Sequence, residues 1–508
     1  MNRNFNRRQL LKIAGSGAAG LVFGGCLNKL GQQGLSSANT KRPNLIYVLA
    51  DQLRYFSIGY AGDKKAHTPY INRFATQSVS FCNAVSTMPV CSAYRASLFT
   101  GKYPTTTGMV INEMRMNPNH RCIGHVLTDA GYETGYIGKW HLYGNEIENH
   151  DDIKNSFVPP GPYRLGFNGY WAAYNYHHHY YEGYYVKDKP EKTFFAKDIY
   201  EPDGQTDLAI DFMKKKAQSS KPFALFVSYG TPHDPWRDNN VPEKYGAMFK
   251  NVKFPRPPNY SPENDKYADK WGRLSEKQRQ ELEHWQQVYY AMTANLDWNI
   301  GRLTDAVDKA GIADETIIVF TSDHGEMFGA HGRRAKNIFY DEAARVPFLI
   351  RWPGHIPAGS VSDACLGTVD IMPTILSLMR LDIPKEAEGT NLGDCALSKK
   401  CAEPQAAFLQ NTGACAEWED GHEWRALRDK QYTYAIFRID KTELLFDNVA
   451  DPYQMRNLIA EPKYTDVAEN FRKMLKEKMA SLNDTFEQCT WYRDRWTKDR
   501  IILRGAKG

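Results

Sequence analysis

Short apolar runs alternate with segments of helical period along most of the chain. The runs best suited to buried strands cover residues 45–50, 133–137, 223–229, 316–321 and 347–351. Between the third and the fourth, residues 275–310 carry apolar side chains at spacings of four and three, which predicts a long helix with one face in the core. Strands that alternate with helices build a mostly parallel sheet. The sequence therefore predicts an α/β fold with a mixed, mostly parallel sheet sandwiched by helices.

The last quarter of the chain has a different pattern. A helix-like stretch from residue 370 ends near residue 381, and residues 383–401 then bring Pro, Gly and two cysteines. Short strands with turn residues between them follow at 424–428, 432–438 and 443–446, before a final helix at 464–482. We therefore predict a large domain at residues 42–382 and a smaller C-terminal α+β subdomain at residues 383–508 that carries a short antiparallel sheet.

The first 25 residues contain four basic side chains and no Asp or Glu. The paired Arg7 and Arg8, followed by a short apolar stretch, resemble a twin-arginine leader, and the small residues before Cys26 resemble a bacterial lipobox. We predict an export signal at 1–25, a flexible tether at 26–41, and a periplasmic or cell-surface protein held to the membrane by a lipid on Cys26. The alternatives are a cleaved leader without lipid and a soluble protein with an amphipathic start.

Composition narrows the classes of partner. The chain has 508 residues, of which 42% are hydrophobic and 24% charged, as in an ordinary globular protein. The net charge is +5, and without the four basic leader residues it is +1. Nucleic acid is not expected as a partner, because it requires a basic face on the folded domain. An exported chain with nine cysteines can form disulfides; Cys395 and Cys401 are near enough to close a loop, but the sequence does not assign the pairing.

Polar side chains stand where the predicted strands end. Asp51 and Gln52 follow the first apolar run, Asp323 and His324 follow the fourth, and His233 comes shortly after the third. In an open parallel sheet, ligands bind outside the carboxyl ends of the strands. Two carboxylates and an amide oxygen suit a hard divalent ion such as calcium, whereas imidazole is commoner on transition metals. We therefore predict a metal site among the side chains that follow the first and fourth runs.

Two further pairs of reactive side chains lie near element ends. Lys139 and His141 are two residues apart, so they share a face if the strand at 133–137 continues that far. Cys91 begins a predicted short helix, and Arg95 follows one turn later on the same face. A helix N-terminus attracts anions. Cys91 is therefore either a reactive group at an anion site or a buried structural thiol.

These motifs together resemble the sulfatase family of the alkaline-phosphatase superfamily, from about residue 42 to residue 458. The segment Cys91-Ser92-Ala93-Tyr94-Arg95 resembles the signature Cys-x-Pro/Ala-x-Arg, whose cysteine is oxidised to formylglycine after translation. Residues 131–141 resemble the second signature of the family, and residues 345–354 and 443–458 also match. The resemblance implies that residues 42–382 form the catalytic domain.

The resemblance also implies a role for each candidate residue. Residue 91 would be the nucleophile as the hydrated aldehyde, with Arg95 and Lys139 holding its oxygens. His141 would be the base that breaks down the covalent intermediate, while Lys336 and His233 would contact the sulfate and its bridging oxygen. One calcium ion would be bound by five groups, namely Asp51, Gln52, Asp323, His324 and the formylglycine derived from Cys91. An enzyme that generates formylglycine would be a partner.

The expected activity is that of a sulfuric ester hydrolase acting on a sulfated carbohydrate. Eight of the 30 tyrosines fall within residues 163–185, where they form either a packed flap or a substrate rim. Tyrosyl groups match both the CH faces and the hydroxyls of sugars. A phosphodiesterase or phosphonate monoester hydrolase of the same fold is the enzymatic alternative. A noncatalytic binder of sulfated glycan is a third possibility, if Cys91 is never oxidised.

Overall fold

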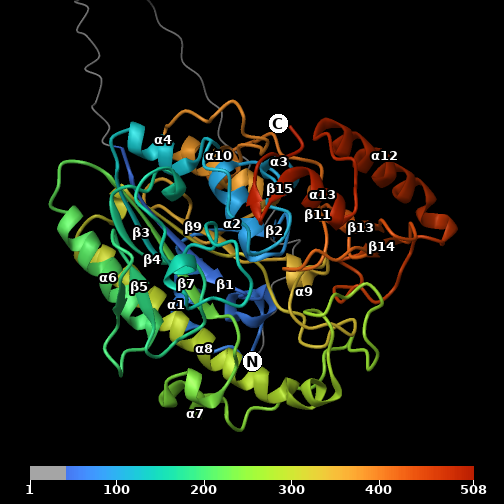
Figure 1. Ribbon diagram of the computed structural model, residues 1–508, viewed down its shortest axis with the longest axis horizontal. Helices are drawn as coiled ribbons and strands as arrows, with labels where there is room; N and C mark the ends of the chain where they lie inside the picture. The colour runs from blue at the N-terminus through green and yellow to red at the C-terminus, as the bar shows by residue number, and fades with distance from the viewer. Residues whose placement is uncertain (1–41, 508) are drawn as a thin grey trace, which may run out of the picture. The chain divides into compact units, whose positions relative to one another are not determined.

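Ten strands pair in one sheet, in the order β10-β2-β9-β8-β1-β7-β3-β4-β5-β6 (Figure 1). The computed structural model describes residues 42–507. The strands are β1 (Asn44–Asp51), β2 (Val79–Val85), β3 (Glu133–Lys139), β4 (Tyr170–Tyr174), β5 (Tyr184–Val186), β6 (Lys192–Phe194), β7 (Phe223–Pro232), β8 (Thr316–Ser322), β9 (Phe348–Arg351) and β10 (Ser360–Gly367). The five apolar runs of the sequence are confirmed as β1, β3, β7, β8 and β9.

The sheet is mixed and mostly parallel, as predicted. β3, β7, β1 and β8 form a central parallel block, β4 extends it beside β3, and β10 runs parallel to β2. β9 is antiparallel to both of its neighbours, and β5 and β6 are antiparallel at one edge. Because the strands of the central block end at the same edge, the polar residues that follow them gather there.

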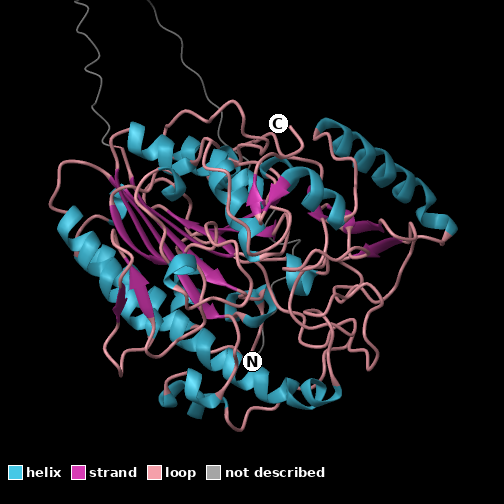
Figure 2. Cartoon of the chain, in the orientation of Figure 1, coloured by secondary structure: helices cyan, strands magenta, loops and turns pink. Residues whose placement is uncertain are grey.

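Alternate side chains of β1 pack into two different hydrophobic cores. The odd-numbered residues from 45 to 49 lie in one core, and the even-numbered residues from 46 to 50 lie in the other. The first core includes α2 (Cys91–Thr100), α4 (Ile123–Asp129) and α10 (Ile371–Leu378); the second includes α1 (Pro69–Thr76), α6 (Glu201–Lys216) and α8 (Glu276–Lys309). Helices therefore cover both faces of the sheet (Figure 2), which explains why β1 is apolar from residue 45 to residue 50.

The long helix α8 confirms the prediction for residues 275–310. Its N-terminus is closed by a capping box, in which Ser275 Oγ accepts from the Gln278 backbone and Gln278 Oε1 accepts from the Ser275 backbone. The apolar residues in its second half pack on the sheet. The remaining helices are α3 (Pro104–Thr107), α5 (Ile153–Ser156), α7 (Glu243–Phe249), α9 (Asp341–Ala344), α11 (Gly393–Ala396), α12 (Thr465–Ser481) and α13 (Cys489–Trp496).

The predicted antiparallel sheet near the C-terminus is confirmed. It consists of β11 (Ala407–Asn411), β12 (Trp424–Arg428), β13 (Tyr432–Phe437) and β14 (Glu443–Asp447), and α12 packs against it. A two-stranded ribbon, β15 (Thr497–Lys498) with β16 (Ile501–Ile502), follows α13. The second sheet shares a hydrophobic core with residues before position 382, such as Phe339. The domain boundary at 382 stays a prediction.

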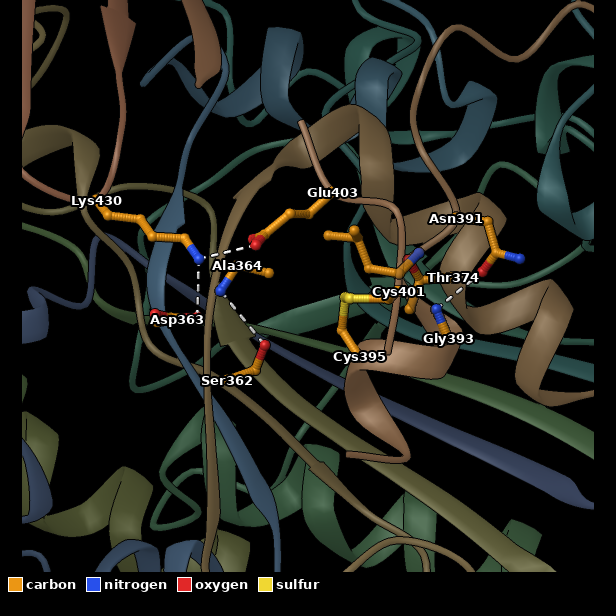
Figure 3. The surroundings of a disulfide bond; sticks show 11 residues. Ser362, Asp363, Ala364, Thr374, Asn391, Gly393, Cys395, Cys401, Glu403 and Lys430 are labelled. Carbon is orange, nitrogen blue, oxygen red and sulfur yellow. Dashed lines mark hydrogen bonds and ion pairs between the residues drawn. A yellow bond between two sulfur atoms is a disulfide. The ribbon is translucent and has the colours of Figure 1, made fainter. Parts of the chain in front are cut away.

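A disulfide joins Cys395 of α11 to Cys401 (Figure 3). Beside it, Lys430 in the turn between β12 and β13 donates to Asp363 of β10 at 3.0 Å and to Glu403 at 2.8 Å. Within residues 42–507, no helix is both long enough and apolar enough to cross a membrane. The predicted export signal at 1–25 and the tether at 26–41, with Cys26, lie outside the described residues.

Candidate active site

Cys91 is the first residue of α2 and lies where β1 and β8 end. Its Sγ is 3.7 Å from Asp51 Oδ1, the last residue of β1, and 3.2 Å from His324 Nε2, two residues after β8. The chain is extended at Val90, so the helix starts at residue 91 itself. The positive end of the helix dipole is therefore directed at a buried thiol.

Two lysines approach the Cys91 sulfur. Lys336 Nζ lies 3.1 Å and Lys139 Nζ 3.9 Å from Sγ. Burial raises the pKa of the Cys91 thiol, but Lys139, Lys336 and His324 together lower it well below its usual value. Burial likewise lowers the pKa of Lys336, but Cys91 and Asp51 raise it above its ordinary value. The surroundings of residue 91 therefore favour an anion there.

Arg95 lies one helical turn after residue 91, as its spacing predicts, but its guanidinium contacts carboxylates and not the sulfur. Its Nη2 is 3.4 Å from Asp51 Oδ2 and 3.5 Å from Asp323 Oδ2. Its Nη1 donates to Ser228 Oγ of β7 at 2.7 Å. All three ionic groups are fully buried, so the arginine balances two carboxylates that have no access to water.

Four buried donor groups form a candidate metal centre, made of Asp51, Cys91, Asp323 and His324. One donor atom from each lies within 4.8 Å of those of the others. Carboxylate and imidazole groups are both ligands of divalent metals. Four of the five metal residues proposed from the sequence therefore lie together and can hold a divalent ion.

The two carboxylates of this centre have pKa values shifted in opposite directions. Burial and the neighbouring thiolate raise the pKa of Asp51, but the cations Lys139, His233 and Lys336 lower it to about 2. Burial and the charge of Asp51 raise the pKa of Asp323 above its ordinary value. Two buried like charges repel each other, and a cation between them would relieve the repulsion. The donor set thus fits a bound metal.

Gln52, the fifth predicted metal residue, lies beside this centre with its side chain fixed on both sides. Its Nε2 donates to Glu326 Oε2 at 2.7 Å, and its Oε1 accepts from Lys336 Nζ at 3.2 Å. The Gln52 backbone N–H donates to Asp323 Oδ1 at 3.0 Å. Glu326 therefore orients the amide so that the oxygen faces the cationic side of the site.

His233 contacts Lys336 and is the least buried of the six predicted catalytic residues. Its Nε2 lies 2.9 Å from Lys336 Nζ, and its Nδ1 lies 3.0 Å from Asp234 Oδ1. Burial and Lys336 lower the pKa of His233, but Asp234 and Asp51 raise it to about 9. With this pKa His233 is protonated at neutral pH, so its imidazolium and the Lys336 ammonium are two cations in contact. An anionic group that binds between them would relieve their repulsion, and the protonated His233 can act as a proton donor.

His141 lies just beyond β3, in a turn. The strand ends at Lys139, so the two residues do not share a strand face, and the φ of His141 is 59°. Its Nε2 is 3.4 Å from Glu113 Oε1. His141 is among the groups that lower the pKa of Cys91. The imidazole therefore lies near residue 91 and contacts a buried carboxylate.

The tyrosine-rich segment is mostly interior. Tyr174, Tyr176, Tyr180 and Tyr184 are each 1% exposed, so they are packing residues and do not form a rim. Histidines of the same segment line an open cavity of about 700 Å³, which we call the His178 cavity. The ring of His178 stacks on that of His233, with 4.3 Å between centroids and 8° between planes. The His178 cavity is therefore adjacent to the catalytic groups.

Three contacts in the site were not found from the sequence. Asp234 directly follows His233, so adjacency is a signal that could have identified it. Glu326 comes two residues after His324 and could have been found in the same way. Glu113 is distant from every motif, and nothing in the sequence marks it as the partner of His141.

Known proteins resemble this chain over most of its length. The sulfatase family model matches residues 43–381, and the model for the C-terminal region of N-sulphoglucosamine sulphohydrolase matches residues 329–481. An ulvan-active sulfatase from Formosa agariphila is 37% identical over 455 residues, which cover 89% of this chain and 84% of that protein. An N-acetylglucosamine-6-O-sulfatase from Bacteroides thetaiotaomicron is 25% identical over 549 residues, which cover 92% and 90%.

A solved structure from Bacteroides fragilis, assigned to the sulfatases, superposes with a TM-score of 0.76 at 29% identity and covers 91% of this chain and 100% of that one. The fold is that of a hydrolase of the alkaline-phosphatase superfamily. Within it, the chain belongs to the sulfatase family, and its activity is that of a sulfatase.

Proposed function

We propose that this sulfatase removes sulfate from a sulfated carbohydrate through a formylglycine made from Cys91. The observation that carries the proposal is the convergence on residue 91 of Lys336, Lys139 and His324, which lie 3.1 to 3.9 Å from its sulfur. The hydroxyls of a hydrated aldehyde would take the place of that sulfur. They would then stand at a helix N-terminus among groups that stabilise negative charge.

The proposed reaction has two stages on residue 91. One hydroxyl, ionised among the cations that surround residue 91, attacks the ester sulfur, the bond from sulfur to the sugar oxygen breaks, and His233 gives a proton to the departing alcohol. His141 then removes the proton of the second hydroxyl, the C–O bond between residue 91 and the sulfate breaks, and the aldehyde is restored; water hydrates it again before the next turnover. The 2.9 Å contact of His233 with Lys336 supports this assignment, because Lys336 also reaches residue 91 and can hold the sulfate between them.

We propose calcium as the ion of the candidate metal centre. Asp51, Asp323, His324 and residue 91 would hold it, with Gln52 beside them. Two oxygen-donating carboxylates favour a hard cation, and oxidation of Cys91 would replace the soft sulfur donor by oxygen. When bound, the cation would withdraw negative charge from the sulfate group.

A sugar as the leaving group is supported by the space next to His233. The His178 cavity is lined by histidine, aspartate and asparagine side chains, which exchange hydrogen bonds with hydroxyls. The relatives include an ulvan-active sulfatase and an N-acetylglucosamine-6-O-sulfatase. We therefore propose that the alcohol protonated by His233 is a sugar hydroxyl that occupies this cavity.

We also propose that the protein is exported and held to a membrane by a lipid on Cys26, with residues 42–382 as the catalytic domain. Export is supported by the paired arginines and the short apolar stretch after them, and lipid attachment by the small residues before Cys26. Cys26→Ser should move the protein from the membrane fraction to the soluble fraction. Equal membrane association of the variant would contradict the anchor while leaving export open to a separate test with Arg7→Lys and Arg8→Lys.

The experiment that tests the proposed reaction is mass spectrometry of the peptide that contains Cys91, from protein made in its natural host. Conversion of the thiol-bearing side chain to an aldehyde is expected. An unmodified thiol in active enzyme would contradict the formylglycine mechanism. Release of sulfate from sulfated glycans, compared with cleavage of a phosphate diester, then separates a sulfatase of carbohydrates from a phosphodiesterase of the same fold.

A further inference from the structure

A second cavity lies across the segment 234–237 from the His178 cavity. It has a volume of about 520 Å³, and we call it the Trp285 cavity. Asp234, Pro235 and Arg237 line both cavities, so this segment is a wall between them. Asp234 is the residue that pairs with His233. Both cavities therefore adjoin the group that we assign to the departing sugar oxygen.

One wall of the Trp285 cavity is a single face of α8. Lys277, Glu281, His284 and Trp285 follow one another at positions i, i+4, i+7 and i+8, which lie on one side of a helix. Trp285 packs on Trp236 with 5.6 Å between ring centroids. The cavity thus offers a half-buried aromatic surface of the kind that supports the CH face of a sugar ring.

The carboxylates of this cavity lie beside basic side chains. Asp234 pairs with His233 at 3.0 Å. Glu281 Oε1 lies 3.9 Å from Lys277 Nζ, and Asp238 Oδ1 lies 3.5 Å from His284 Nε2. Each of these carboxylates therefore has a basic neighbour within the protein.

Two arginines of the cavity have no such partner. Among residues 42–507, neither Arg334 nor Arg237 forms an ion pair with a carboxylate. The Arg334 guanidinium stands over the Trp285 ring, 5.5 Å from its centroid. Burial raises the pKa of Asp234, but His233 and Arg334 lower it, so Arg334 stands close to the His233–Asp234 pair although it forms no ion pair itself. A guanidinium presents paired donors that match a carboxylate or a sulfate.

We propose that the Trp285 cavity is a subsite for an anionic sugar next to the sulfated one, with its carboxylate or sulfate on Arg334 and Arg237 and its ring against Trp285. The His178 cavity is less suited to an anion, because Glu148 and Asp152 also line it and neither forms an ion pair among the described residues. The enzyme would then recognise at least two sugars of an acidic glycan. This inference deepens the proposed function and rests on it for the place of the reactive sugar.

The test is a binding measurement that needs no turnover. A fluorescein-labelled dextran sulfate oligosaccharide is titrated with the full-length protein and its anisotropy is followed, with neutral dextran of the same length in parallel. Arg334→Ala and Arg237→Ala should each raise the Kd for dextran sulfate about tenfold, as expected for loss of one charge-assisted hydrogen-bonding group. Trp285→Ala should raise it as well. Carboxymethyl dextran distinguishes recognition of a carboxylate from recognition of a sulfate.

The chain contains a matched control. Arg495 stands over Trp491 at 5.2 Å, also has no ion pair among the described residues, and lines neither cavity. Arg495→Ala should leave the Kd within twofold of the wild-type value. Equal Kd values for Arg334→Ala, Arg237→Ala and Arg495→Ala would overturn the subsite, as would equal affinity of the wild type for dextran sulfate and neutral dextran. If the wild-type enzyme binds the probe at this cavity but releases no sulfate, the proposed function fails and the subsite does not.

Discussion

Glu113 Oε1 lies 3.4 Å from His141 Nε2, and both side chains are buried. Burial raises the pKa of Glu113, but the charge and the hydrogen bond of His141 lower it, so the carboxylate is ionised and holds the imidazole in place. We expect Glu113→Gln to reduce kcat about tenfold or more, because a misoriented base loses part of the 10²- to 10⁴-fold that general base catalysis supplies. KM should change little, since neither group binds the sugar.

Rescue and a matched control distinguish orientation from folding. Glu113→Asp keeps the charge and should restore part of kcat, while Glu191→Gln, an exposed glutamate that lines neither cavity, should have no effect. A larger change in KM than in kcat for Glu113→Gln would show that the pair acts in binding and not in catalysis.

Cys91→Ala should abolish turnover. The residue is the proposed nucleophile, and no other cysteine among the described residues belongs to the candidate metal centre. The side chain is small, so its loss in a polar site should cost little stability. Sulfate release and the thermal unfolding midpoint measure the two effects. Retention of more than a few per cent of wild-type turnover would contradict the assignment of residue 91 as the nucleophile. A lowered unfolding midpoint would show that the variant had lost stability instead. Cys365→Ala removes a buried thiol that does not interact with the site and is the control.

His233 and Lys336 touch each other at 2.9 Å but should behave differently in kinetics. A proton donor matters most when the leaving group is a sugar alcohol and least when it is a nitrophenol. We expect His233→Ala to slow a sugar sulfate by roughly 10²-fold and an aryl sulfate much less. Lys336→Ala should harm both substrates comparably, because Lys336 Nζ reaches residue 91 and acts on the sulfate.

The comparison of kcat/KM for both variants on both esters decides between the roles. Equal losses on the two esters for His233→Ala would remove it from the role of acid. A loss confined to the sugar sulfate for Lys336→Ala would transfer that role to the lysine.

Most of the fold could be predicted, because continuous apolar runs mark buried parallel strands and the spacing in residues 275–310 marks α8. Edge strands were harder. β10 is exposed in its first half, and β6 has three residues, so neither shows a clear apolar run. The direction of β9 depends on its neighbours, which are antiparallel to it, and its own composition does not encode this.

The residues of the candidate site could also be predicted only in part. Residues at strand ends, such as Asp51 and Asp323, could be placed together because parallel strands end at one edge. Glu113 could not, because a loop brings it to His141 and its backbone is held by Arg500, which is distant in the sequence. Tyrosines at 174–184 looked equally suited to a rim and to a core; their burial was decided by tertiary packing.

Removal of metal should reduce activity if the candidate centre holds calcium. Prolonged chelation should lower sulfate release, and added calcium should restore it better than zinc does. Calcium should also raise the thermal unfolding midpoint of the chelated protein, since a ligand that binds only the folded state stabilises it. Asp323→Ala should abolish this calcium-dependent rise.

Asp314→Ala is the control for the metal experiment, because this aspartate is exposed and precedes β8, whereas Asp323 follows it. It should keep the full response to calcium. Better recovery with zinc, or a calcium response that survives Asp323→Ala, would contradict the assignment of calcium to this centre.

Glu201 should make the folded protein less stable as the pH rises. Its Oε1 accepts hydrogen bonds from Tyr174 and Gln205, both at 2.9 Å. Burial raises its pKa from 4.5 to about 8, so the folded state keeps a proton that the unfolded chain has lost. This contribution is fully present below about pH 4.5 and is lost as the pH rises through about 8, at roughly 1.4 kcal/mol per pH unit between them.

Glu201→Gln cannot ionise and should keep the hydrogen bonds to its carbonyl oxygen, so the fall in unfolding free energy between about pH 6 and pH 8 should shrink by a few kcal/mol. Asp297 and Asp370, whose pKa values burial raises to about 7 and about 6, change stability in the same direction, so part of the fall should remain. Urea unfolding at both pH values measures this difference in unfolding free energy.

The control is Glu182→Gln, an exposed glutamate near Tyr184, which should keep the wild-type difference. An unchanged difference in Glu201→Gln would mean that the buried carboxyl is already ionised in the folded protein.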